Sequence, residues 1–223
     1  MICIIQSRMN SKRLPNKALK LLCGKTILER VVMNLQLSKK ITNIIVATSK
    51  SRSDDLIELF CKKKKIKCYR GPLKNVYQRY YQLIKSQKIK NFIRITGDSP
   101  LIDYRIIEKG IELFKKGNFD IVTNSLKKTY PQGQSVEIIN SEVFCRVKKK
   151  IIEKDYKEHI TKYFYNNKKA FKIKNFFYQN DVSHLNLSVN TKKDYEFIKD
   201  IISRLKDNKA NLKKIIKYCK NRI

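Results

Sequence analysis

A strand-like segment at the start of the chain runs directly into a loop rich in cations. Met1–Ile5 is apolar and is typical of a buried strand. In an open α/β sheet the ligand crevice lies at the carboxyl ends of the strands, and several cations there predict a polyanionic ligand such as a triphosphate. The alternative is a basic surface loop in a chain that is basic throughout. The polar residues concerned are Arg8, Ser11, Lys12, Arg13 and Lys17.

A second polar turn follows a later apolar segment. Phe92–Ile95 predicts a strand that leads into Gly97 and Asp98, and glycine there permits a tight turn and the close approach of a ligand. Carboxyl ends of parallel strands meet at one sheet edge, so we expect Asp98 beside the first loop. A carboxylate next to bound phosphates is a ligand that Mg²⁺ uses. The alternative is an aspartate that only caps the turn before Pro100.

Two further polar clusters fit helix capping. Asn190 follows a predicted strand, and Asp194 lies in the first turn of a predicted helix. Capping by Asn190 or Thr191, with Asp194 three or four residues on, explains this pattern without a ligand. Asp103 is likewise expected to cap the helix that starts near Tyr104.

Two common phosphate-binding loops do not fit the sequence. The dinucleotide fingerprint G-x-G-x-x-G is absent. The segment Gly24–Thr26 resembles the end of a P-loop, but Leu19 stands where the first glycine belongs, and the segment lies well beyond the first strand. We therefore expect Gly24 to form the turn before a helix that begins at Ile27.

The segments that must position these side chains alternate between strand and helix. This order predicts an α/β fold with a Rossmann-like, mixed but mostly parallel sheet and helices on both faces, in one domain over residues 1–223. The last strands are expected to be an antiparallel or edge addition. The predicted strands are Ile2–Gln6, Ile44–Ala47, Ile66–Tyr69, Phe92–Ile95, Ile121–Thr123, Val136–Ile139, Phe171–Tyr178 and Leu185–Val189. The predicted helices are Ile27–Leu37, Asp54–Lys63, Val76–Ile84, Ile106–Phe114, Val143–Lys149, Tyr156–Tyr165, Lys192–Leu205 and Leu212–Tyr218.

Composition limits the classes of function. The chain has 51 Lys and Arg against 19 Asp and Glu, a net charge of +32. This charge suggests nucleic-acid binding. However, the lysines are spread evenly and the chain is rich in Lys, Ile and Asn, as AT-rich coding produces, so we favour a small anionic substrate.

No apolar run approaches the ~20 residues that span a bilayer, and no signal peptide is apparent, so we expect a cytoplasmic protein. The six cysteines lack C-x-x-C spacing and predict buried, reduced thiols.

Six segments, in order over roughly residues 1–200, resemble the sugar-acid cytidylyltransferases. That family includes the 3-deoxy-manno-octulosonate and acylneuraminate cytidylyltransferases, and the resemblance is greatest to its spore-coat polysaccharide branch. Each motif alone is weak, whereas the ordered set is fairly specific. The segments are Gln6–Lys17, Asn75–Tyr80, Thr96–Asp103, Gly133–Glu137, Glu158–Thr161 and Val189–Thr191.

The resemblance implies a fold, a reaction and a set of site residues. The fold is that of the nucleotide-diphospho-sugar transferases. The reaction is Mg²⁺-dependent transfer of CMP from CTP to an acidic sugar with loss of pyrophosphate, for surface-glycan biosynthesis, in a possible homodimer. The implied nucleotide-binding residues are Arg8, Ser11, Arg13, Lys17 and Gly97, with Arg13, Lys17 and Asp98 as catalytic residues. Asp98 and Asn190 are implied at the metal, and Glu137, Glu158 and His159 on the sugar side.

Three positions depart from the family pattern. Asn16 stands where the family usually has glycine, but asparagine tolerates left-handed backbone better than most residues. Ser7 replaces a small alanine. Asn190 stands where the family usually has an aspartate that serves the metal, and an amide is a weaker, neutral ligand. A non-catalytic, nucleotide-binding homologue is therefore an alternative to an active enzyme.

Overall fold

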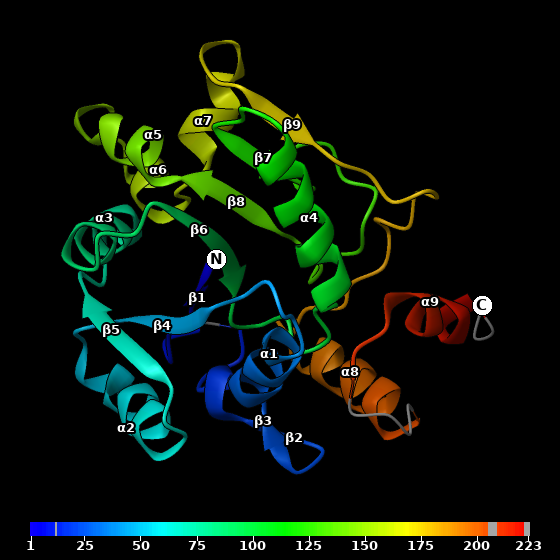
Figure 1. The fold of residues 1–223 in the computed structure, drawn as a ribbon. Helices are drawn as coiled ribbons and strands as arrows, with labels where there is room; N and C mark the ends of the chain where they lie inside the picture. The colour runs from blue at the N-terminus through cyan, green and yellow to red at the C-terminus, as the bar shows by residue number, and fades with distance from the viewer. Residues whose placement is uncertain (12, 205–208, 221–223) are drawn as a thin grey trace.

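The computed structural model describes residues 1–11, 13–204 and 209–220. Lys12 and Leu205, which belong to segments discussed above, lie outside the described residues. A seven-stranded sheet in the order β5-β4-β1-β6-β8-β7-β9 forms the centre of this part of the chain (Figure 1). Its strands are β1 (Ile2–Gln6), β4 (Asn43–Ser49), β5 (Lys67–Gly71), β6 (Asn91–Thr96), β7 (Ile121–Thr123), β8 (Glu137–Asn140) and β9 (Ile173–Asn175).

The first strand lies in the middle of the parallel part of the sheet. β1 pairs in parallel with β4 and β6, and β4 pairs in parallel with β5. Cys3 and Ile5 face one layer of core while Ile4 faces the other, so β1 is buried on both faces and reads as a continuous apolar run. The carboxyl ends of these strands meet at one edge, which is where the loop after β1 begins.

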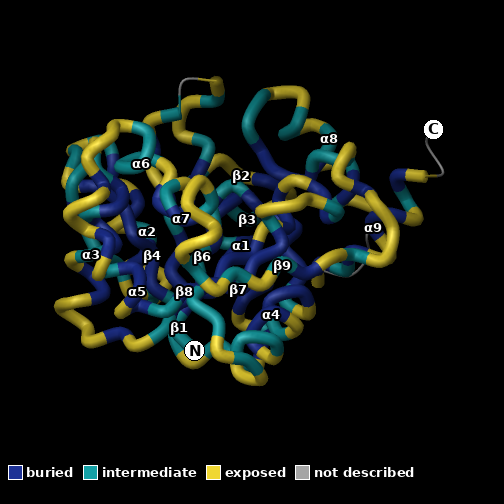
Figure 2. Tube along the Cα trace, turned by 90° about the horizontal axis from the view of Figure 1, so that it is seen from above, coloured by how far each residue is buried: buried dark blue, intermediate teal, exposed yellow. Residues whose placement is uncertain are grey.

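Helices cover both faces of the sheet (Figure 1), and the buried residues of Figure 2 lie between the layers. One core holds the apolar sides of α1, α2, α4, α8 and α9, and the other holds those of α3, α5 and α7. This confirms the predicted mixed α/β fold. The helices are α1 (Ile27–Gln36), α2 (Asp55–Lys63), α3 (Val76–Ser86), α4 (Tyr104–Lys116), α5 (Ser141–Arg146), α6 (Lys154–Glu158), α7 (Lys162–Asn166), α8 (Lys192–Arg204) and α9 (Leu212–Lys220).

The segment around Gly24 is a hairpin and not a phosphate loop. Strands β2 (Leu21–Leu22) and β3 (Lys25–Thr26) are antiparallel, and the two turn residues Cys23 and Gly24 have positive φ of 49° and 78°. Two positive values are typical of a tight hairpin turn. Thr26 then caps α1 in a capping box with Glu29. The expected turn at Gly24 is therefore present.

The later part of the chain differs most from the sequence prediction. β8 is antiparallel to β6 and β7, whereas β9 is a short edge strand parallel to β7. Leu185–Val189, predicted as a strand, is not one in the structure and makes only the isolated bridge of Asn186 to Gln132. The predicted helix Tyr156–Tyr165 is two short helices, because the chain turns at residues 159–161 to bury Ile160 in the core.

All six cysteines lie in the described part of the chain and are free thiols. Cys23 is exposed, so the prediction of buried thiols holds for only part of the set. Among the described helices, none is both long enough and apolar enough to span a bilayer.

Candidate active site

A pocket of about 1110 Å³ lies at the carboxyl edge of the sheet. The loop after β1, the end of β6, the β5–α3 loop and α6 form its walls. Among the described residues its lining has far more cations than carboxylates, a balance that favours an anionic ligand. The lining cations are Arg8, Arg13, Lys17, Lys74, Arg79, Lys154 and Lys157, and the carboxylates are Asp98 and Glu158.

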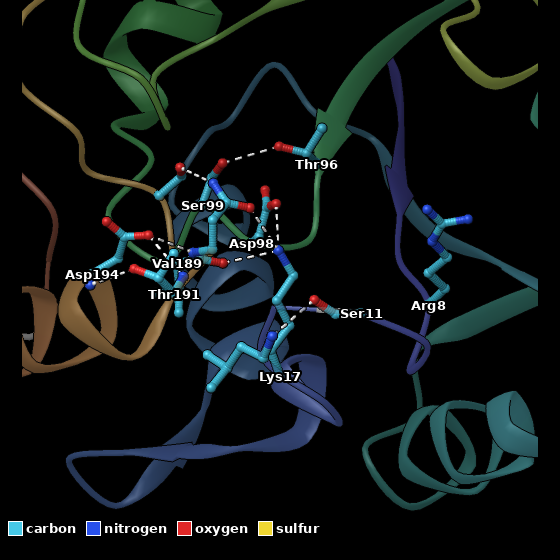
Figure 3. Close-up of polar contacts among 12 residues, drawn as sticks. Arg8, Ser11, Lys17, Thr96, Asp98, Ser99, Val189, Thr191 and Asp194 are labelled. Atoms are coloured by element: carbon cyan, nitrogen blue, oxygen red, sulfur yellow. Dashed lines mark hydrogen bonds and ion pairs between the residues drawn. The ribbon is translucent and has the colours of Figure 1, made fainter. Parts of the chain in front are cut away.

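The Lys17 side chain makes hydrogen bonds to three residues at the centre of this site (Figure 3). Its Nζ atom donates to Asp98 Oδ2, to the Val189 carbonyl oxygen and to Asn190 Oδ1, each at 2.9 Å. The Lys17 and Asp98 side chains are only 16% and 24% exposed, so this is a partly desolvated ion pair. The structure thus brings Lys17, implied above as a nucleotide-binding residue, into contact with Asp98 and Asn190, which are implied at the metal.

The oxygen atom of Asn190 is turned toward Lys17 by its neighbours. Its Nδ2 donates to Ser188 Oγ at 2.8 Å, and Ser188 Oγ donates in turn to Asn186 Oδ1. Asp194 does not join the site, because its Oδ2 accepts from the amides of Asn190 and Thr191. The helix-capping interpretation is therefore correct for Asp194, whereas the Asn190 side chain bonds both to Ser188 and to Lys17.

These oxygen atoms also fit a hard divalent cation. A carboxylate, an amide oxygen and a main-chain carbonyl converge on one point, where the Lys17 ammonium now provides the positive charge. Mg²⁺ is commonly held by one or two such ligands together with substrate phosphates and water. No group of three or more His, Cys, Asp or Glu residues arranged to hold a metal exists among the described residues.

The loop after β1 takes its shape from Asn16 and from a buried carboxylate. Asn16 has φ 56° and ψ 18°, the left-handed conformation, and its amide donates to the Met9 carbonyl at 3.2 Å. Asparagine can thus serve where glycine is usual. Asp54, fully buried before α2, accepts from the Met9 amide at 2.7 Å and from the Ser49 amide at 3.1 Å. It ties the loop to the end of β4.

Gly97 is required by packing within the protein. A Cβ atom at this position would lie 2.9 Å from both Cβ and Oγ of Ser7, closer than real Cβ contacts. The two residues therefore bring the ends of β1 and β6 into contact, with the Gly97 amide donating to the Gln6 carbonyl at 2.9 Å. Both residues also line the pocket. The close approach anticipated for a ligand is thus made to Ser7.

The remaining predicted residues lie on both sides of the pocket or behind it. Ser11, Arg13 and His159 line the pocket. Arg8 Nη2 pairs with Glu158 Oε1 at 3.0 Å in the pocket, where the Arg8 side chain is exposed and the Glu158 side chain is half-buried. Glu137 does not line the pocket; it is buried behind the wall, where Arg94 and Tyr165 bond to its carboxylate.

Several pocket residues were not singled out from the sequence. Arg79 is 1% exposed, lies on the apolar side of α3 and donates to the carbonyl oxygens of Pro72 and Leu73. Burial lowers the pKa of its guanidinium. The sequence could have indicated a special role for Arg79, because it lies at helical spacing between Val76 and Leu83 on a side of the helix that is otherwise apolar. The lysines Lys74, Lys154 and Lys157 gave no signal in a lysine-rich chain.

The sequence model of the cytidylyltransferase family matches residues 2–223 of this chain. This chain belongs to that family. As a cytidylyltransferase it is a nucleotidyltransferase, and the family assignment supports nucleotidyl transfer from CTP. The resemblance inferred from six ordered motifs is confirmed.

Known proteins agree with this assignment. The chain is 29% identical to the Bacillus subtilis spore coat polysaccharide biosynthesis protein SpsF, over 90% of this chain and 85% of that protein. It is similar to a cytidylyltransferase structure from Leptospira borgpetersenii serovar Hardjo-bovis, with a TM-score of 0.94, 29% identity and 99% and 94% of the two chains covered. CMP:2-keto-3-deoxy-manno-octonic acid synthetase, solved in complex with CTP, shares the fold with a TM-score of 0.69, 15% identity and 91% and 98% covered.

Proposed function

We propose that this cytidylyltransferase moves CMP from CTP to a hydroxyl group of an acidic sugar, with release of pyrophosphate, for surface-glycan biosynthesis. The observation that carries the proposal is the set of oxygen atoms around Lys17 inside a cationic pocket at the carboxyl edge of the sheet. The proposal extends to a single domain over residues 1–223, a cytoplasmic location and a possible homodimer. The CTP complex of a protein with the same fold supports CTP as the nucleotide.

The residues of the loop after β1 would bind the triphosphate. Nucleotidyl transfer is an in-line displacement at phosphorus, so the protein mainly positions the reactants and neutralises developing charge. Ser11 and Arg13 line the pocket beside Lys17, and Arg8 stands at its other side, paired with Glu158. Arg13 and Lys17 would stabilise the leaving pyrophosphate as its negative charge grows. Glu158 and His159 belong to the proposed sugar side.

Lys17 must exchange partners for this chemistry. In the structure its ammonium is bonded to Asp98, Val189 and Asn190. A triphosphate offers it stronger, charged acceptors, and its long flexible stem can reach them without movement of the main chain. Asp98 and Asn190 would then be free to hold Mg²⁺, which when bound supplies a Lewis acid and a template for the phosphates.

The function is tested with the purified full chain, CTP, Mg²⁺ and a panel of 2-keto sugar acids. The expected result is release of pyrophosphate that depends on one member of the panel, with formation of a CMP-sugar seen by mass spectrometry. CTP binding without turnover on any acid would favour the non-catalytic alternative. Failure to bind CTP at all would end the proposal.

Replacing Asn190 with aspartate separates an active enzyme from a non-catalytic homologue. A second carboxylate beside Asp98 strengthens the attraction for a divalent cation, so we expect the half-saturating Mg²⁺ concentration to fall by about threefold to tenfold. In an active enzyme kcat stays within about threefold, because the amide oxygen already serves as a ligand. The measurement is a Mg²⁺ titration of pyrophosphate release, and turnover that appears only in Asn190→Asp would contradict the proposed activity of the natural chain.

A further inference from the structure

A buried chain of polar side chains runs behind the pocket and ends on its wall at Gln6. The Tyr165 hydroxyl donates to Glu137 Oε1 at 2.5 Å, and Arg94 Nη1 donates to Glu137 Oε2 at 2.5 Å. The same guanidinium donates from Nε and Nη2 to Gln6 Oε1, at 3.3 and 3.1 Å. The Arg94 and Glu137 side chains are 15% and 5% exposed, so little water competes for these bonds.

The sheet register brings these groups together. Arg94 on β6 lies opposite Glu137 on β8 and opposite Ile4 on β1. Side chains two residues apart on a strand share a face, so Gln6 lies on the same face as Ile4, within reach of the Arg94 guanidinium. The bonds from Arg94 to Glu137 and to Gln6 therefore follow from strand pairing, whereas Tyr165 reaches Glu137 from α7.

The chemistry of arginine decides which way the Gln6 amide points. A guanidinium carries only donors, so the amide atom that faces Arg94 must be the oxygen. The Nε2 amine is consequently directed away from Arg94, and among the described residues nothing accepts a hydrogen bond from it. Because Gln6 lines the pocket, its two N–H groups are presented there as unused donors.

Glu137 keeps this arrangement in place from a buried position outside the pocket lining. Both of its carboxylate oxygens are already taken, by Arg94 and by Tyr165. Burial by itself lowers the pKa of Arg94, but the adjacent Glu137 carboxylate raises it above the ordinary value, so the guanidinium stays charged. Burial and the same carboxylate raise the pKa of Tyr165, so its hydroxyl keeps the proton it donates.

The surroundings of Gln6 suit a flat, neutral ligand group. The pocket lining also includes the apolar Leu73 and Val76, together with Arg79, whose Nη1 makes no hydrogen bond to the described residues. Apolar surface beside the Gln6 donors matches a flat ring that carries acceptors on one edge. Cytosine has two adjacent acceptors, O2 and N3, whereas uracil carries a donor at N3.

We propose that Gln6 is a specificity-determining residue that donates a hydrogen bond to the acceptor edge of the cytosine base, with Arg94 and Glu137 as positioning residues. The proposal rests on the proposed function, because it takes CTP as the nucleotide. It assigns to Glu137 a role behind the pocket in place of a contact with the sugar.

The test compares Gln6→Leu with the unmodified chain for two ligands, CTP and ribose 5-triphosphate, which has the same sugar and phosphates but no base. We expect the calorimetric Kd of CTP to rise by about tenfold to thirtyfold, because a donor that the base needs is lost. The Kd of ribose 5-triphosphate should stay within about twofold, since its contacts are untouched. An equal loss for both ligands, or unchanged CTP binding, would overturn the proposal.

A second pair of variants guards against a folding effect. Gln6→Glu keeps the shape and the bond to Arg94 but offers the base an acceptor in place of a donor, so CTP should weaken more than ribose 5-triphosphate. Asn10→Asp adds the same charge to the same pocket and should weaken both ligands equally. Melting temperatures of all variants show whether the fold is kept.

Glu137→Gln tests whether Glu137 positions Arg94 and Gln6, again by the ratio of the Kd values of CTP and ribose 5-triphosphate. We expect the preference for CTP over ribose 5-triphosphate to fall by about threefold, since the weaker hold on Arg94 lets the Gln6 amide turn. An unchanged preference would remove Glu137 from the proposal. If the unmodified chain binds CTP while every Gln6 variant keeps the preference, only this inference fails; if the unmodified chain binds no CTP, the proposed function fails as well.

Discussion

Replacement of Asp98 with alanine is expected to lower kcat by about 10²–10³, the typical loss when one group that stabilises the transition state is removed. Asp98 supplies the only formal negative charge among the three oxygen ligands around Lys17. Without it the site keeps two neutral oxygens, which bind a divalent cation weakly. The measurement is pyrophosphate release from CTP with saturating sugar acid over a range of Mg²⁺ concentrations.

The Asp98 variant needs controls for charge and for folding. Asp181→Ala removes a carboxylate that bonds to Ser183 on an exposed loop, outside the pocket, and should leave kcat unchanged. Asp98→Asn keeps an oxygen at the same place without the charge. In the presence of CTP it should bind Mn²⁺ about as weakly as Asp98→Ala does, as measured by electron paramagnetic resonance. Full activity in Asp98→Ala would remove Asp98 from the proposed metal site.

Replacement of Lys17 with methionine is expected to lower kcat/KM by about 100-fold, mainly through a higher KM for CTP. The ammonium is the group that we expect to move from Asp98 to the triphosphate, and a charge-assisted bond to phosphate is lost with it. The unliganded protein should also lose about 1–2 kcal/mol of unfolding free energy, since Asp98 keeps its charge without its donor. Steady-state kinetics and urea unfolding measure the two effects.

Lys20→Met is the matched control for this variant. Lys20 lies three residues further on, is exposed outside the pocket and has its ammonium 4.9 Å from the Tyr195 ring centre. Its loss removes the same charge and should change kcat/KM by less than twofold. Wild-type kinetics in Lys17→Met would show that Lys17 has only the structural role seen without nucleotide.

Much of the fold was predictable because it depends on local patterns. The buried strand at Ile2–Gln6 and the helix that begins at Ile27 follow from the pattern of apolar residues, and both are present. The later segments were harder. Leu185–Val189 looks like a strand because apolar and polar residues alternate in it, but its apolar side chains are buried by packing in the core and not by a sheet. Periodicity reports burial and does not distinguish these two cases.

The candidate site was predictable in its parts and not in its connections. The cationic loop and Asp98 could be placed at one sheet edge, because parallel strands end on the same side. The bonds from Lys17 to Asp98 and to Asn190 span 81 and 173 residues of sequence and depend on side-chain reach. Glu137 was expected near the sugar, but its position opposite Arg94 is set by an antiparallel pairing that the sequence did not show.

By itself, therefore, the sequence determined the class of fold, the family and the position of a cation-rich loop after β1, because each rests on residue types at fixed local spacing. Only the tertiary structure decided that the Lys17 ammonium lies between Asp98 and Asn190, and that Arg94 donates to the amide oxygen of Gln6. Those two arrangements are hydrogen bonds between distant strands and loops. Their direction is set by which atoms donate and which accept once the chain has brought them together.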